Sequence, residues 1–238
     1  MFDCIAPRYA LVNSLFSVGR DAAWRREAVR LTVVSDDDDV LDVACGTGDF
    51  TVGFVVAGAK SVVGCDFAHQ MLIRAAGSSP RGLAPVRDAP AAGDTARTKA
   101  CVSRWCEADA LSLPFRSGSF SICSCAFGVR NFADLDMGLR EMYRVLRRGG
   151  RAVILEFTRP GNRVVRSLYE LYSNRFMPIA ATIISGDKSG AYRYLPRSVV
   201  LFLDAEQMCA RLRHAGFGRV TATPLTMGSV TVYVATRE

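Results

Sequence analysis

The eleven residues from Val40 to Phe50, VLDVACGTGDF, constrain the fold of this chain more than any other stretch. The apolar run over 40–44 is short enough for a buried parallel strand. The turn Gly46-Thr47-Gly48 follows, and Asp49 stands where the N-cap of a helix over 50–57 is expected. Glycines in such a turn let a ligand approach the backbone closely, because a Cβ there would clash. The stretch therefore predicts one half of a nucleotide-binding βαβ unit.

The second half of that unit follows at a suitable distance. Residues 61–66, SVVGCD, read as a second buried strand that ends in Asp66, 18 residues after Gly48. An acid about 20 residues past the glycines commonly accepts hydrogen bonds from the ribose hydroxyls of a nucleotide. An ordinary α/β loop with a capping aspartate would explain the turn alone, but not the turn, the helix start and the second acid in register.

The turn also indicates which kind of nucleotide is bound. A dinucleotide fingerprint requires a third glycine, and Thr51 occupies that position. The pattern Asp42-x-Ala44-x-Gly46-x-Gly48 instead resembles the first motif of the Rossmann-like S-adenosylmethionine methyltransferases, usually D/E-x-G-x-G-x-G. This resemblance implies that a set of residues in and before the turn contributes to the cofactor site: Asp42, Gly46, Thr47 and Gly48.

Composition limits the class of protein. The 238 residues fit one α/β domain, no apolar run reaches the roughly 18 residues that span a bilayer, and the first residues lack a secretory signal. Eight cysteines without paired C-x-x-C units, and two distant histidines, predict no metal site and a reduced, cytoplasmic protein. The net charge of +7 favours acidic partners such as an anionic membrane surface. No basic stripe interleaved with aromatic residues is present, so we do not expect nucleic-acid binding.

The rest of the chain alternates between the two regular structures. Strands are predicted at 105–108, 119–127, 151–157, 218–223 and 229–236, and helices at 69–76, at 134–147 before Gly149-Gly150, and at 204–215. This order predicts a mostly parallel sheet with an antiparallel edge strand and helices on both faces. We expect a single domain over 1–238, with a helical cover at 1–34, a long flexible loop at 77–103 and a helical lid at 160–200.

Two polar pairs stand where predicted strands end, which is where open α/β sheets bind ligands. Asp109-Ala110 follows the third strand, where an acid could accept the adenine amino proton. Arg130-Asn131 follows the fourth strand, where a cation beside an amide could hold an oxyanion. A surface aspartate and a surface ion pair are the alternatives that stay open here.

The order of motifs resembles one family, the ubiquinone/menaquinone biosynthesis C-methyltransferases. The similarity runs from Phe2 to about Tyr233 and includes FDCIAPRY, VLDVACGTGDFT, ADALSLPF, FGVRNF, MYRVLRRGGRAVILEF and YRYLPRSV. It implies a seven-stranded class I methyltransferase fold with S-adenosyl-L-methionine as cofactor. It also implies contacts of Thr47 in the turn, Asp66 on the ribose, and Asp109 with Ala110 at the adenine.

The resemblance further implies methylation of a polyprenyl hydroquinone, most simply demethylmenaquinol. A phenol has a pKa of about 10, so the ring needs a base or a neighbouring cation to ionise at neutral pH. Arg130 could stabilise the phenolate and Asn131 could orient it. Four further residues are candidates to line the ring pocket: Tyr9, Asn13, Tyr192 and Tyr194. The expected partners are a lipid-soluble quinol and, by peripheral contact, the inner membrane face; a homodimer is left open.

The chain departs from the family pattern at Ala10, Asp21, Ala126, Arg148 and Tyr233. Three alternatives stay open, the first because of these departures and the third because of the net charge of +7. The first is a class I methyltransferase of another small or lipid substrate, and the second is a cofactor-binding scaffold of a quinone pathway without catalysis. The third is a nucleic-acid methyltransferase, although FGVRNF stands where amino-methylating enzymes of this fold often carry an Asn/Asp-Pro-Pro-aromatic motif.

Overall fold

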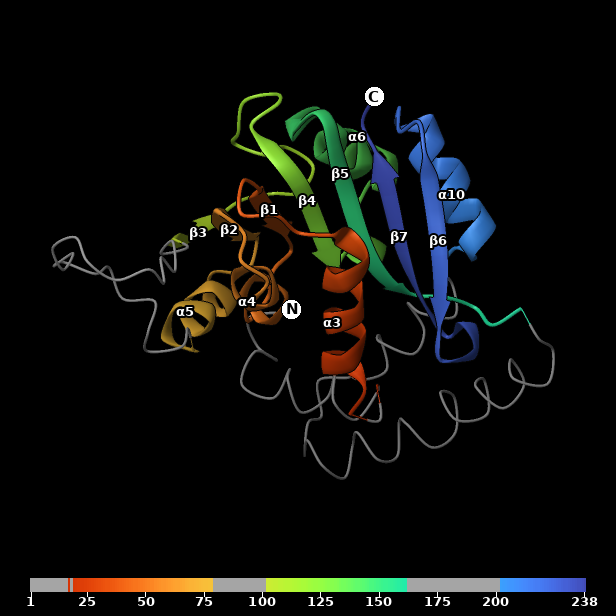
Figure 1. Cartoon of the computed structure of the whole chain (residues 1–238), viewed down its shortest axis with the longest axis horizontal. Coiled ribbons are helices and arrows are strands. Elements are labelled where there is room, and N and C mark those ends of the chain that lie inside the picture. The colour runs from red at the N-terminus through yellow and green to blue at the C-terminus, as the bar shows by residue number, and fades with distance from the viewer. Residues whose placement is uncertain (1–16, 18, 79–101, 162–201) are drawn as a thin grey trace, which may run out of the picture.

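The computed structural model describes residues 17, 19–78, 102–161 and 202–238. Seven strands form one sheet, in the order β3-β2-β1-β4-β5-β7-β6 (Figure 1). The strands are β1 Asp39–Val43, β2 Ser61–Asp66, β3 Val102–Glu107, β4 Phe120–Ala126, β5 Leu146–Phe157, β6 Val220–Leu225 and β7 Val230–Thr236. The helices are α3 Asp21–Thr32, α4 Asp49–Val56, α5 His69–Ser78, α6 Leu135–Val145 and α10 Ala205–His214, with short 3₁₀ turns η2 Val129–Asn131 and η4 Thr226–Gly228.

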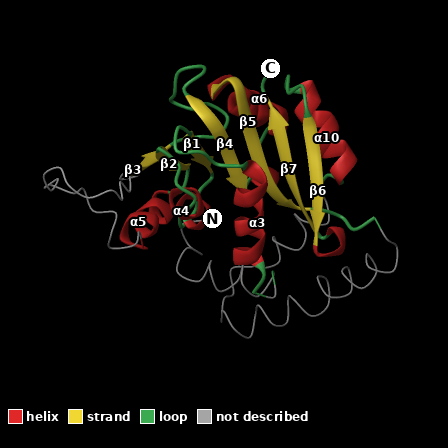
Figure 2. Ribbon diagram, viewed as in Figure 1, coloured by secondary structure: helices red, strands yellow, loops and turns green. Residues whose placement is uncertain are grey.

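The sheet is mostly parallel, as predicted. Strands β1 to β5 pair in parallel with one another, and β7 pairs antiparallel with both β5 and β6. The reversed strand β7 therefore lies one place in from the edge, and β6 is outermost (Figure 2). This confirms the predicted α/β fold and places its antiparallel pairing at the end of the sheet formed by the last two strands.

Apolar residues fill both sides of the sheet. Along β1, Val40 packs with α3 and α4, whereas Leu41 packs with α6 and α10. Ile122 and Cys123 of β4 divide in the same way, because successive strand residues point to opposite faces. Figure 1 shows the two helical layers, with α3 and α4 in front of the sheet and α6 and α10 behind it. Burial on both faces explains why these strands are continuous apolar runs.

The cysteines of the described residues fit this packing. All six are free thiols, and five of them are buried: Cys45, Cys65, Cys123, Cys125 and Cys209. Burial raises the pKa of the Cys123 and Cys125 thiols well above the ordinary value. These cysteines are therefore neutral, unreactive members of the core.

The turn before α4 differs from the prediction in one respect. Gly48, at φ +84°, is the N-cap of α4, and Asp49 is the first helical residue. The predicted N-cap at Asp49 is wrong, because the tight turn needs a left-handed residue and glycine adopts that conformation at little cost. A Cβ at Gly48 would also lie 2.5 Å from the indole of Trp105 on β3.

The boundary between α6 and β5 also differs. The start of α6 agrees with the helix predicted over 134–147, because Asp134 is its N-cap and accepts a hydrogen bond from the Met137 N–H. The end does not agree, because the helix stops at Val145. Gly149 and Gly150 lie inside β5, which begins at Leu146. Gly149 adopts φ +73°, and the register with β4 shifts between Phe120 and Ile122. The glycines therefore form an irregularity in a strand rather than a helix stop.

Half of the predicted cover and most of the predicted loop and lid lie outside the described residues. Helix α3 belongs to the predicted cover at 1–34, and the ends of the 77–103 loop contribute to α5 and β3. The third strand begins at Val102, three residues before the prediction. Among the described helices, none is long and apolar enough to cross a membrane.

Candidate active site

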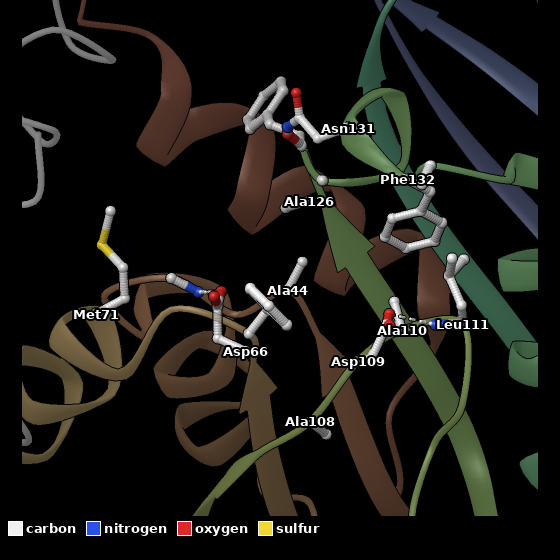
Figure 3. Close-up of a pocket in the computed structure, with 15 residues that line it drawn as sticks. Ala44, Asp66, Met71, Ala108, Asp109, Ala110, Leu111, Ala126, Asn131 and Phe132 are labelled. Atoms are coloured by element: carbon white, nitrogen blue, oxygen red, sulfur yellow. Dashed lines mark hydrogen bonds between the residues drawn. The ribbon is translucent and has the colours of Figure 1, made fainter. Parts of the chain in front are cut away.

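A cavity of about 330 Å³ opens at the carboxyl ends of β1, β2 and β4. Strand order reverses between β1 and β4, and this is the position where open α/β sheets bind ligands. Figure 3 shows Asp66 and Met71 on one side of the cavity and Asn131 and Phe132 on the other, with Ala44 between them. Most of the lining is apolar, so the few polar groups in it fix how a ligand is oriented.

Asp66 occupies the end of β2, as predicted, and is tied to the glycine turn. Its Oδ2 atom accepts a hydrogen bond of 2.8 Å from the Gly46 N–H, and its Oδ1 atom accepts one of 2.8 Å from the Ala68 N–H. Each carboxylate oxygen has two lone pairs, so the group can still accept hydrogen bonds from two ribose hydroxyls. The backbone bonds hold the carboxylate at the edge of the cavity for that purpose.

Asp109 and Ala110 line the same cavity from the turn after β3. The Asp109 Oδ1 atom accepts a 2.9 Å hydrogen bond from the Leu111 N–H, which is an Asx turn. Leu111 and Phe132 supply an apolar surface beside this turn (Figure 3). A flat base between apolar side chains, with a carboxylate at its edge, fits this end of the cavity.

A second, smaller pocket of about 20 Å³ continues from the cavity. The two share Ala44, Gly46, Ala126 and Phe127. Its other lining residues are mostly polar or charged: Arg25, Asp42, Cys45, Thr47, Asp49 and Phe50. The cavity and this pocket together therefore offer an apolar chamber with two carboxylates at one end and a charged recess at the other.

Asp42 is almost completely buried beneath the glycine turn. Its Oδ2 atom accepts a 2.6 Å hydrogen bond from the Thr51 hydroxyl, and its Oδ1 atom accepts one of 2.8 Å from the Ser124 hydroxyl. Burial raises the pKa of Asp42 to about 6, against the lowering effect of both hydroxyls and of Arg25. Asp42 thus ties β1 to α4 and β4 and borders the charged recess.

The predicted pair Arg130 and Asn131 is divided between two environments. Asn131 lines the cavity, whereas the Arg130 side chain is only 2% exposed. The Arg130 Nη1 atom lies 2.7 Å from Glu156 Oε1 and donates a 2.6 Å hydrogen bond to the Phe127 carbonyl. This corrects the expectation that both side chains face the ligand, because the guanidinium is drawn into the core by a fully buried carboxylate.

Two residues that shape this region were not predicted from the sequence. Phe127 lines the cavity with φ +57°, a left-handed conformation that is unfavourable for a bulky residue. Glu156 holds the Arg130 that bonds to the Phe127 carbonyl, and so fixes this turn. The acid at the end of the apolar run AVILEF could have indicated a buried partner for Arg130. No sequence pattern indicated the left-handed φ of Phe127.

The departures from the family pattern fall in different places. Ala126 lines the cavity, and Asp21 forms an ion pair with Arg25. Tyr233 is buried in β7, where burial raises the pKa of its hydroxyl to about 12 despite hydrogen bonds with Thr158 and Thr231. Arg148 is exposed on the irregular start of β5. Tyr9, Asn13, Tyr192, Tyr194 and Ala10 lie outside the described residues.

The donor set fits a nucleoside with a charged tail. Asp66 and Asp109 suit a ribose and a base edge, Gly46 of the glycine turn lines both the cavity and the recess, and the recess is charged. Among the described residues, no group of three or more His, Cys, Asp or Glu could hold a metal ion.

Comparison with known proteins shows the family to which the chain belongs. A sequence model of the ubiE/COQ5 methyltransferase family matches residues 1–237. The chain belongs to this family. The family and the fold together assign S-adenosyl-L-methionine as its cofactor and methyl transfer as its reaction.

Curated relatives match over the whole chain. A demethylmenaquinone methyltransferase from Thermus thermophilus is 42% identical over 239 residues, and the match covers 100% of both proteins. A protein of the same name from Deinococcus radiodurans is 39% identical, over 100% of this chain and 91% of the relative. A ubiquinone/menaquinone biosynthesis C-methyltransferase from Geotalea daltonii is 37% identical, over 98% of this chain and 93% of the relative.

Solved structures agree with the fold. A SAM-dependent methyltransferase from Thermotoga maritima superposes with a TM-score of 0.64 at 18% identity, over 100% of both chains. One from Aquifex aeolicus superposes with a TM-score of 0.62 at 13% identity, over 95% of this chain and 96% of the other. At these identities, the likeness supports the class I methyltransferase fold alone.

Proposed function

We propose that this protein methylates a ring carbon of a polyprenyl hydroquinone, converting demethylmenaquinol to menaquinol. The observation that carries this proposal is the identity of 42% with the Thermus demethylmenaquinone methyltransferase along the whole of both chains. The cavity supports it, because an apolar chamber with a single amide on one wall suits an aromatic ring.

The chemistry asks mainly for alignment. S-adenosyl-L-methionine, when bound, would supply the methyl group. A ring hydroxyl would first lose its proton to water, and the adjacent ring carbon would then take the methyl while the electron pair of the methyl–sulfur bond goes to sulfur. Loss of that carbon's proton to water and return of a proton to the ring oxygen would restore the aromatic hydroquinone. The positive sulfonium and the electron-rich ring neutralise each other, so the protein contributes positioning and exclusion of water. The apolar walls formed by Phe127 and Phe132 serve this exclusion.

Asn131 is the residue that we assign to the substrate in this cavity. Its amide lies across the cavity from Asp66 (Figure 3), where it can orient a ring hydroxyl. Arg130 supports the reaction indirectly: it holds the Phe127 carbonyl and Glu156, and so fixes the turn that carries Asn131. Arg130 is thus a positioning residue in this proposal.

A lipid-soluble quinol also implies where the protein works. We propose that it acts in the cytoplasm and meets its substrate by peripheral contact at the inner membrane face. The net charge of +7 supports this, because anionic lipid headgroups attract basic proteins. No nucleic-acid partner is proposed, and a homodimer stays a prediction.

Complementation in cells tests the proposal. A menaquinone-producing host that lacks its own C-methyltransferase is given the wild-type gene, the Asp66→Ala variant or the Asp37→Ala variant. Lipid extracts are then analysed by mass spectrometry. We expect menaquinone with wild type and with Asp37→Ala, an exposed acid outside the site, and demethylmenaquinone alone with Asp66→Ala. Accumulated demethylmenaquinone with a wild-type protein that is expressed and binds cofactor would overturn it.

A further inference from the structure

We infer that Arg25 of α3 binds the carboxylate of the methionine part of S-adenosyl-L-methionine. The inference concerns the cofactor alone, so it stands or falls separately from the quinol proposed above. It assigns a binding role to a helix that precedes the nucleotide-binding unit in the chain.

The position of Arg25 is the first argument. Its side chain is 13% exposed and lines the small recess beside Gly46 and Thr47. Its guanidinium carbon lies 5.7 Å from the ring centroid of Phe127, which also lines the main cavity. The neighbouring Trp24 anchors α3 to the far end of the sheet, because its Nε1–H donates a 2.8 Å hydrogen bond to the Thr226 hydroxyl. Arg25 is therefore held at the recess by a fixed helix.

The recess lies on the path that the methionine part of the cofactor would take. Asp66 and Asp109 occupy the nucleoside end of the cavity, so the methionine part must extend away from them, past the glycine turn. The recess continues the cavity in that direction through Ala44 and Gly46. Its volume of about 20 Å³ is far too small for a ring, so the nucleoside cannot enter it.

The charges of the recess are the third argument. The methionine part ends in an ammonium and a carboxylate on one carbon. The described lining of the recess holds two acids, Asp42 and Asp49, which suit the ammonium, and a single cation, Arg25, which suits the carboxylate. The planar guanidinium matches a carboxylate geometrically as well as in charge.

Asp21 holds the guanidinium ready for this contact. The Arg25 Nη1 atom lies 2.6 Å from Asp21 Oδ2, and Ser17 donates a hydrogen bond to the other oxygen. Burial acts to raise the pKa of Asp21, but the hydrogen bond and charge of Arg25, with the hydrogen bond from Ser17 and a backbone hydrogen bond, together outweigh burial and lower that pKa. A guanidinium carries five N–H donors, so one ion pair leaves the capacity to bind a second carboxylate.

Calorimetric binding with two ligands tests the inference. The probes are S-adenosyl-L-methionine and its decarboxylated analogue, which keeps the sulfonium, the amine and the nucleoside. They are titrated into wild type, Arg25→Ala, Arg25→Gln and Arg26→Ala. Arg26 is the matched control, because it is the next arginine of α3 but is exposed and lines the outer groove between α3 and α4 rather than the recess.

We expect wild type and Arg26→Ala to bind the cofactor roughly 10- to 100-fold more tightly than the decarboxylated analogue, as a charge-assisted hydrogen bond would give. Both Arg25 variants should lose that preference and keep the affinity for the analogue. A preference retained in Arg25→Gln, an equal loss for both ligands, or the same loss in Arg26→Ala would overturn the inference. The wild-type protein alone also tests the inference, because equal affinity for the two ligands would overturn it.

Discussion

Asp42 carries a buried negative charge whose cost depends on pH. Burial raises its pKa from 3.8 to about 6. Between these values, the folded protein keeps the proton that the unfolded chain has lost. The free energy of unfolding should therefore fall, by about 3 kcal/mol from this group, as pH rises from about 4 to about 6, and should stay lower above that range.

Asp42→Asn should remove this fall in the free energy of unfolding between about pH 4 and pH 6, because an amide stays neutral. The amide can still form hydrogen bonds with the Thr51 and Ser124 hydroxyls. Urea unfolding at a series of pH values measures the difference from wild type. Asp37→Asn, at an exposed position, should leave the wild-type pH dependence unchanged. If the free energy of unfolding had the same pH dependence in wild type and in Asp42→Asn, Asp42 would not be the group that causes it.

The Arg130–Glu156 pair should matter more for stability than any exposed pair. Both side chains are at most 2% exposed, so removing one partner leaves a buried charge uncompensated. Arg130→Ala should lower the free energy of unfolding by about 3–5 kcal/mol. Arg30→Ala is the control: it removes an exposed pair with Glu27 and should change the free energy of unfolding far less. Equal effects in urea unfolding would contradict a buried pair at Arg130.

The glycine turn before α4 makes a prediction about a whole element. A Cβ at Gly48 would meet both a left-handed φ of +84° and the Trp105 ring at 2.5 Å. Gly58 has a similar φ of +89° with no heavy atom within 4 Å of such a Cβ. Gly58→Ala should therefore cost only the backbone strain, about 1–2 kcal/mol. Gly48→Ala should cost more and should also weaken cofactor binding, because β3 and the turn must separate.

Thermal unfolding and calorimetric cofactor binding on the two glycine variants check this expectation. Both substitutions carry the same backbone strain, so the difference in stability between the two variants measures the clash with Trp105. Equal stability and equal cofactor affinity in both variants would mean that the turn is not packed against β3 as described.

The elements that sequence reasoning located well are those set by local patterns. Asp204 caps α10 with a reciprocal bond to Gln207, and the run Ser61–Asp66 is β2 as predicted. The misplaced boundaries have tertiary causes. Val145 ends α6 because β5 starts at Leu146 to pair with Phe120, and no local signal in the chain specifies that pairing.

The candidate site divides in the same way. Asp66, Asp109 and the glycine turn come together because strand ends in a parallel sheet meet at one edge, which the order of motifs predicts. The burial of Arg130 could not be predicted, because it depends on Glu156, 26 residues away on the neighbouring strand. Arg25 was missed because no pattern relates a helix before the first strand to the turn after it.

Methyl transfer to a quinol ring is the reaction that we propose for the whole molecule. The direct measurement is transfer of label from radiolabelled S-adenosyl-L-methionine to reduced demethylmenaquinone in detergent, with purified wild type, with Asp66→Ala as the blank and with Asp37→Ala as the control. We expect label in the ring with wild type and with Asp37→Ala, and none with Asp66→Ala. Wild-type protein that binds the cofactor yet leaves the quinol unlabelled would contradict this proposal.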